Sequence, residues 1–225
     1  MPLHTADALV LRTYKLGEAD RIVVFLTRDR GKKRGVAKGA RRQRSRFSGA
    51  LEPLTEVRVA YFESERRELV GLNYAETIRS PLALSAAIDS ATAGSTGHYM
   101  LVEYFAELLD EWAQDSDADD RLYRLGASML DALTSGVPVE PLARYFEYWL
   151  LRLQGVYPEA RGTLSPAALG FLTAARSVPP HEVGAVAADV RALRELEGVH
   201  RALIATHLEK SLKSDRVLRE LRRQS

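Results

Sequence analysis

The run of residues 28–46, RDRGKKRGVAKGARRQRSR, concentrates one kind of chemistry more densely than any other part of the chain. Ten of these nineteen residues are Lys or Arg, and one is acidic. Glycines at 31, 35 and 39 let the backbone turn between the charges. Like charges at this density repel one another and are stable only in solvent or against an anion. The run therefore predicts a surface that follows the phosphates of a nucleic-acid backbone, with affinity that does not depend on base sequence.

The candidate DNA-binding residues are the ten cations of this run: Arg28, Arg30, Lys32, Lys33, Arg34, Lys38, Arg41, Arg42, Arg44 and Arg46. Four aromatic residues could offer faces on which bases stack, or could equally lie in the core: Phe25, Phe47, Tyr61 and Phe62. A plain solvated loop is the alternative interpretation of the basic run. An anionic membrane surface is a weaker alternative, because no amphipathic anchor helix accompanies the charges.

The remaining polar residues do not predict catalysis. The chain has no P-loop, G-x-S-x-G or H-E-x-x-H motif, and its five histidines are isolated. It has no cysteine, which excludes disulfides, thiolate zinc sites and cysteine nucleophiles. A nuclease would need clustered carboxylates for metal ions, whereas Asp20, Asp29 and Glu63 are scattered through the basic part of the sequence. We therefore expect a binding protein rather than an enzyme, with no cofactor and no structural metal.

The charge of the chain is unevenly spread, although the net charge is only +2. Residues 1–80 hold 17 Lys/Arg against 10 Asp/Glu, a difference of +7, and residues 81–225 hold 15 against 20, a difference of −5. Such asymmetry indicates one part that binds a polyanion and a second part with another use. The acidic stretch DSDADD at residues 115–120 lacks the Gly and Glu of a calcium loop, and predicts a helix start. No signal peptide and no run of 18 apolar residues are present, so we expect a cytoplasmic location.

Residues 1–80 are predicted to form the first domain, a small closed β-sheet. Short apolar or alternating runs occupy residues 5–12, 21–27, 33–37, 55–62 and 68–78, with Gly and Pro at the joints. Val57, Val59 and Tyr61 share one face of the fourth run. An OB-fold is the five-stranded barrel that best fits this length, and a Tudor- or SH3-like barrel fits the strand count almost as well.

Residues 81–225 are predicted to form an all-α second domain, which makes the fold class α+β. Apolar residues recur at helical spacing through residues 101–112, 122–133 and 142–153, and the last of these helices is bounded by Pro138 and Gly155. Ser165-Pro166 predicts a helix start, with serine as the cap. A long helical pattern runs through residues 183–212, with a break expected near Gly198 or Lys213.

The chain resembles the RecO family of bacterial recombination mediators from end to end, and residues 82–139 are the least distinctive part of the resemblance. Residues 8–53 follow that family's opening, with Gly17-Glu18, Asp20-Arg21 and the segment VAKGAR at residues 36–41 as hallmarks. Residues 144–159, RYFEYWLLRLQGVYPE, are similar to the family's central helix and the turn after it, and residues 210–221 to its ending. Many members carry a four-cysteine zinc module after that turn. Because this chain has no cysteine, we expect the module to be reduced to a short loop near residues 156–165.

The resemblance implies a non-catalytic protein that binds single- and double-stranded DNA and anneals complementary strands at the bacterial nucleoid. It also implies action with RecR to load RecA onto DNA coated by single-strand-binding protein. The acidic C-terminal tail of single-strand-binding protein is expected to dock on the helical domain, through Arg144, Tyr145, Trp149 and Arg152. The alternative for the two arginines is pairing with Glu140, Glu147 or another nearby carboxylate, and the aromatic residues could belong to the core. A different alternative for the whole chain is a protein–protein adaptor whose basic run is incidental.

Overall fold

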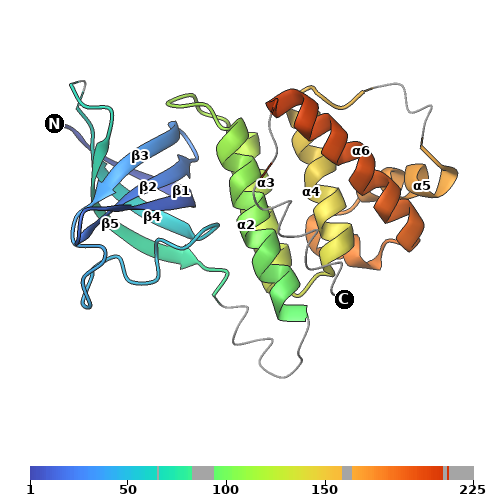
Figure 1. The fold of residues 1–225 in the computed structure, drawn as a ribbon, viewed down its shortest axis with the longest axis horizontal. Helices are drawn as coiled ribbons and strands as arrows, with labels where there is room; N and C mark the ends of the chain where they lie inside the picture. The colour runs from blue at the N-terminus through green and yellow to red at the C-terminus, as the bar shows by residue number, and fades with distance from the viewer. Residues whose placement is uncertain (65, 83–93, 159–163, 210–211, 213–225) are drawn as a thin grey trace. The chain divides into compact units, whose positions relative to one another are not determined.

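The computed structural model describes residues 1–64, 66–82, 94–158, 164–209 and 212 (Figure 1). Five strands come first, and the rest of the described chain is helical, so the expected α+β class is confirmed. The strands are β1 (Leu3–Leu16), β2 (Asp20–Thr27), β3 (Gly31–Ala37), β4 (Glu56–Phe62) and β5 (Val70–Arg79). The helices are α2 (Gly94–Trp112), α3 (Asp120–Thr134), α4 (Val139–Leu153), α5 (Pro166–Ala175), the short 3₁₀ helix η1 (Pro180–Ala185) and α6 (Val190–Leu208).

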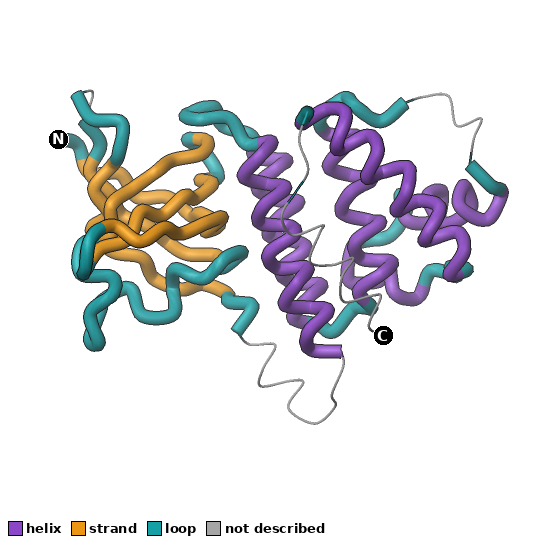
Figure 2. Tube along the Cα trace, viewed as in Figure 1, coloured by secondary structure: helices purple, strands orange, loops and turns teal. Residues whose placement is uncertain are grey.

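The strands close into a barrel in the order β1-β2-β3-β5-β4 (Figure 2). The long strand β1 pairs antiparallel with β4 through its first half and with β2 from Ala8 onward, which closes the cylinder. Strand β3 pairs in parallel with β5, whereas an up-and-down meander would pair β3 with β4. This crossover is the Greek-key arrangement of an OB-fold, so the topology decides between the barrels that the sequence left open.

Side chains alternate between the inside and the outside of the barrel, as the period of two along a strand requires. Val57, Val59 and Tyr61 share one face of β4, as predicted. This face points inward and meets the inward residues of the other strands. Phe47, Ala50 and Leu51 from the β3–β4 loop join the same core. Three of the four candidate stacking residues are therefore core residues: Phe25, Phe47 and Tyr61. Only Phe62 among the four is exposed, at 38%.

Part of the barrel's outer wall is covered by helix. Leu9, Leu11, Val24 and Leu26 face outward from β1 and β2, yet each is at most 2% exposed. Residues Val102–Leu130, from α2 and α3, belong to the same compact unit as the barrel. The contact is close enough that a Cβ at Gly126 of α3 would lie 2.6 Å from Cδ1 of Leu9. The predicted domain boundary at residue 80 remains a prediction. The grouping of these helical residues with the barrel reflects their contacts and does not define a domain boundary.

The second compact unit contains α4, which packs against α5, α6 and η1. Helix α5 begins as predicted, with Ser165 Oγ accepting a hydrogen bond from the amide of Ala168 at 3.3 Å. The expected long helix from residue 183 is wrong, because η1 ends at Ala185 and α6 starts only after the Asp189 cap. Helix α6 then runs through Gly198 without a break, and Lys213 lies outside the described residues. No helix in the described ranges is long and apolar enough to cross a membrane.

Candidate nucleic-acid interface

The basic run does not form a single loop in the structure. Arg28 and Arg30 lie in the turn between β2 and β3, and the next three cations lie on β3 itself. Lys38 follows the end of β3, and the last four cations occupy the β3–β4 loop. The period of two along β3 sends Lys33 inward and Lys32 and Arg34 outward. The ten cations therefore meet different surroundings, although they are continuous in sequence.

Four of the ten cations pair with carboxylates: Arg28, Arg30, Lys32 and Lys33. Arg28 binds Asp120 at 2.8 Å, and Arg30 lies 3.7 Å from its neighbour Asp29. Lys32 reaches both the backbone oxygen of Asp110, at 2.7 Å, and its carboxylate, at 3.4 Å. These three cations are held by the protein's own acids, which leaves less of their charge for a phosphate.

Lys33 is the most buried of the four, with 9% of its side chain exposed. Its ammonium donates to Glu63 at 2.6 Å and to Ser116 Oγ at 3.1 Å. The hydrogen bond from Lys33 lowers the pKa of the Glu63 carboxyl below its ordinary value. Lys33 is thus a structural cation, held by Glu63 and Ser116.

The acidic stretch that the sequence predicted as a helix start has a second role. The amide of Lys32 donates to the Gln114 carbonyl at 3.1 Å, and the amide of Ser116 donates to the Lys32 carbonyl at 3.0 Å, so this segment adds to the free edge of β3. The approach requires Gly31, whose φ is +67° and whose Cβ, if present, would collide with the backbone of Asp117. Asp119 then caps α3 by accepting from the amide of Leu122 at 3.0 Å. The predicted helix start is confirmed, and the segment also brings carboxylates to the basic strand.

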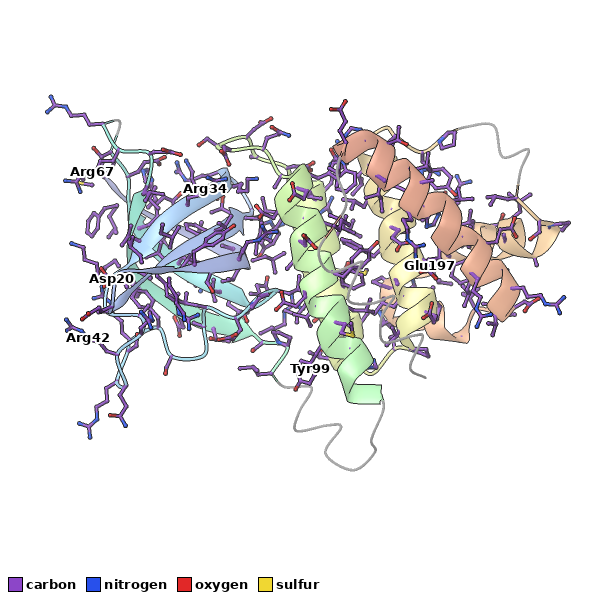
Figure 3. All side chains as sticks on the ribbon, in the orientation of Figure 1. Asp20, Arg34, Arg42, Arg67, Tyr99 and Glu197 are labelled. Atoms are coloured by element: carbon purple, nitrogen blue, oxygen red, sulfur yellow. The ribbon has the colours of Figure 1, made fainter. Side chains whose placement is uncertain are left out.

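Six cations of the run are exposed or face solvent without an ion pair among the described residues: Arg34, Lys38, Arg41, Arg42, Arg44 and Arg46. Arg46 lies over the ring of Phe47, with 5.0 Å from its guanidinium carbon to the ring centroid. Figure 3 labels Arg34 and Arg42 on the barrel, together with Arg67 of the β4–β5 loop. Arg66 and Arg67 are exposed cations that the sequence reasoning missed, because they stand apart from the run. The structure thus narrows the candidate phosphate-binding surface and extends it to a second loop.

The β3–β4 loop is attached to the turn between β1 and β2. The amide of Gly39 donates to Asp20 Oδ1 at 2.8 Å. The backbone amide of Arg41 donates to the Ala19 carbonyl at 2.9 Å, and its guanidinium donates to the Gly17 carbonyl at 2.8 Å. These three hydrogen bonds fix the start of the loop that carries most of the open cations. Asp20 is therefore a loop-positioning residue rather than one of a set of metal-binding carboxylates.

The four candidate residues for the tail of single-strand-binding protein are divided between core and surface. Arg144 is 3% exposed and donates to Glu147 at 2.8 Å, while Glu197 lies 3.6 Å from its second nitrogen. Glu147 also meets His200, whose Nδ1 lies 3.0 Å away and whose ring is fully buried. The alternative that Arg144 pairs with a neighbouring carboxylate is the arrangement observed. The expectation that Arg144 flanks an accessible stripe is corrected, because its partners hold it inside the helical unit.

Arg152 remains on the surface of α4. Its guanidinium donates to the Tyr148 hydroxyl at 2.9 Å and lies 5.8 Å from the ring centroid of Trp149. Trp149 is partly exposed, whereas Tyr145 is 6% exposed and donates to the carbonyl of Val178. Of the four residues, only Arg152 and Trp149 are accessible to a peptide.

Comparisons with known proteins find similar sequences for most of the chain. Residues 1–81 match the family described as Recombination protein O N terminal, and residues 97–162 match Recombination protein O C terminal. A relative from Nocardioides sp., named DNA repair protein RecO, is 35% identical over 94% of this chain and 97% of its own length. The chain belongs to the RecO family. Relatives of the same name from Koribacter versatilis and Bifidobacterium adolescentis are each 42% identical, over 70% and 59% of this chain and 61% and 51% of their own lengths. The chain thus spans between about half and two thirds of these two RecO relatives.

The two RecO family regions correspond to recognisable parts of the structure. The N-terminal region covers all five strands, and the C-terminal region covers α2, α3 and α4. The loop expected to replace a zinc module, near residues 156–165, falls partly on residues 159–163, which lie outside the described residues. No group of three or more potential metal ligands occurs in the described part of the chain.

Proposed function

We propose that this chain is a non-catalytic DNA repair protein that binds single- and double-stranded DNA through its barrel and anneals complementary strands. The RecO family membership and the names of the relatives support a role in DNA repair. Annealing requires two phosphate backbones to approach each other, and cations that release counterions from the backbone make that approach less costly.

One observation carries the proposal: the β3–β4 loop presents open cations without any carboxylate partner among the described residues. Such a surface attracts a polyanion of any base sequence. An adaptor with an incidental basic run is the competing function. In that case the same cations would have no ligand, and binding to DNA would be weak at all salt concentrations.

The test replaces three open cations together, Lys38→Ala, Arg42→Ala and Arg44→Ala. Arg41 is left in place because its hydrogen bonds hold the loop. If each residue contacts one phosphate, the slope of log affinity against log salt for single-stranded DNA should flatten by about 2, at ~0.7 per contact. The rate at which the protein anneals complementary oligonucleotides should fall in parallel, with and without single-strand-binding protein present.

The matched control removes the same charge from the helical unit, by Arg176→Ala, Arg191→Ala and Arg194→Ala. All three side chains are exposed. The control should leave the salt slope unchanged, since these residues lie outside the barrel unit. Equal slopes in the two triple variants would show that net charge, and not the loop, governs binding.

The proposed partners follow from the RecO family. We propose that the chain acts with RecR, in the cytoplasm, to load RecA onto DNA coated by single-strand-binding protein. The acidic tail of single-strand-binding protein would then meet the accessible residues Arg152 and Trp149 rather than Arg144. A cation beside an aromatic face is suited to a ligand with a carboxylate and an apolar end.

A further inference from the structure

Asp120 lies between two arginines that come from distant parts of the chain. Its Oδ1 accepts a hydrogen bond at 2.8 Å from Nε of Arg28, in the β2–β3 turn. Its Oδ2 lies 3.0 Å from Nε of Arg124, one turn further along α3. Each carboxylate oxygen therefore faces its own guanidinium group. The three side chains are between 46% and 64% exposed, and all three residues belong to the barrel's compact unit.

The backbone around Asp120 is fixed on both sides. Before it, residues 114–116 pair with the free edge of β3 through two backbone hydrogen bonds. On the other side, Asp119 caps α3 by accepting hydrogen bonds from the amides of Arg121 and Leu122, each at 3.0 Å. Asp120 is the first residue of α3, where the helix dipole favours a negative charge. The carboxylate is thus held beside the two arginines by more than the ion pairs themselves.

The two arginines form a site that suits one anion. A guanidinium group donates hydrogen bonds in a planar fork, which fits the oxygens of a phosphate as well as those of a carboxylate. Arg28 and Arg124 approach one carboxylate from two elements, so a phosphate in the same place would accept from both. Arg121 shares this face of α3, is exposed, and has no ion pair among the described residues. Asp120 therefore stands where a phosphate group could bind.

This site lies at the opposite end of β3 from the open loop cations. Strand β3 (Gly31–Ala37) is preceded by the turn that carries Arg28 and is followed by the β3–β4 loop. Arg34 projects outward midway along the strand and is exposed. The strand is about 20 Å long, at about 3.3 Å per residue. A DNA backbone that follows β3 from the loop past Arg34 would therefore reach Asp120 and be repelled there.

We propose that Asp120 is an autoinhibitory residue, which holds Arg28 and Arg124 in place of a DNA phosphate and so limits how far DNA binds along β3. This inference rests on the proposed DNA binding and adds a residue that opposes it. Fewer phosphate contacts give a faster dissociation rate, because affinity differences at one interface lie mostly in that rate. An annealing protein must release its duplex product, so this limit favours repeated action.

The test is Asp120→Asn, which keeps the shape of the side chain and removes its charge. Phosphate contacts by one or both freed arginines should steepen the slope of log affinity against log salt for an oligo-dT strand by about 0.7 to 1.4. If the affinities of variant and parent protein meet near 1 M salt, this is a gain of about 5- to 25-fold at 0.1 M. The strand should dissociate more slowly by a similar factor.

Asp117→Asn is the matched control. Asp117 is an exposed acid of the same segment and has no ion pair within the described part of the chain, so its loss changes the net charge equally and frees no arginine. A triple variant, Asp120→Asn with Arg28→Ala and Arg124→Ala, tests where the gain arises. Its salt slope should return to that of the parent protein, because the added contacts depend on these two arginines.

The outcomes separate this inference from the proposed DNA binding. A steeper slope in Asp120→Asn that is absent from Asp117→Asn and lost in the triple variant supports the inference. An unchanged slope in Asp120→Asn, an equal change in Asp117→Asn, or a gain that persists in the triple variant overturns it, while binding through the loop stands. If neither the parent protein nor Asp120→Asn binds DNA, the proposed DNA binding and this inference are both overturned.

Discussion

Two arginines on α4 show how the environment of a residue decides its role. Arg144 and Arg152 lie on one helix and are chemically identical, yet one is 3% exposed between two glutamates and the other faces solvent beside Tyr148. A buried guanidinium is tolerated because carboxylates compensate its charge, and the carboxylates depend on it in return. At this scale Arg144 is a structural residue, and only Arg152 can meet a partner.

The two residues should therefore respond differently to the same substitution. Arg144→Ala leaves Glu147 and Glu197 without their buried cation, and should lower the free energy of unfolding by about 3–5 kcal/mol. Arg152→Ala should cost about 1 kcal/mol or less, because its interactions are at the surface. Urea unfolding followed by circular dichroism measures both. Similar losses in the two variants would contradict the assignment of Arg144 to the core.

At the scale of elements, the β3–β4 loop is the feature that determines how the open cations are presented. The loop has apolar residues that enter the barrel core, and its first turn is held to the β1–β2 turn by Asp20. Gly39 has a φ of +71°, which a side chain would strain, so the turn depends on both residues. The cations therefore lie on a loop whose backbone is held in place by the barrel core and by Asp20.

Asp20→Ala should loosen this loop without removing a cation. The Gly39 amide loses its acceptor, so its hydrogen exchange should become faster, and DNA affinity should fall a few-fold because the cations must be ordered on binding. Asp20→Asn is the matched control, since its side-chain oxygen still accepts from the Gly39 amide. Loss of affinity in the Asn variant as large as that in the Ala variant would assign the effect to charge.

At the scale of the molecule, the barrel does not stand alone as a packing unit. Residues Val102–Leu130 cover the apolar outer wall formed by Leu9, Leu11, Val24 and Leu26. Asp110 and Asp120, from the same helical residues, pair with Lys32 and Arg28. Tyr14 and Phe62 lie elsewhere on the barrel and are exposed, at 47% and 38%. One part of the barrel's outer wall is therefore covered by helix, and another part is exposed.

Gly126 is the residue that tests this cover. A Cβ there would lie 2.6 Å from Leu9 and 2.7 Å from Leu109, so Gly126→Leu should force α3 away from the wall and destabilise the protein by about 1–3 kcal/mol. Gly170→Leu is the matched control in α5, where an added Cβ meets nothing within 4 Å. Because leucine favours helix, that variant should be neutral or more stable by up to about 1 kcal/mol. Thermal unfolding distinguishes the two, and equal shifts would argue against close packing at Gly126.

The sequence by itself determined the local features of this protein. Periodicity and composition depend on neighbouring residues, so the five strands, the Ser165 cap and the density of positive charge in residues 28–46 could all be predicted. The misplaced helix start at residue 183 arose because apolar spacing continues across η1, and the pattern alone cannot show where the backbone leaves the helix.

Only the tertiary structure decided which of those charges are available. Lys33 and Arg34 are neighbours with the same charge, but β3 sends one to Glu63 and the other to solvent. The carboxylates that neutralise Arg28 and Lys32 come from α2 and α3, which are distant in sequence. Strand register likewise brings residues that are far apart in sequence next to one another, as where Ile22 pairs with Val36 and Val36 with Gly71. Pairing between distant segments fixes these contacts, and a local pattern carries no information about which segments will pair.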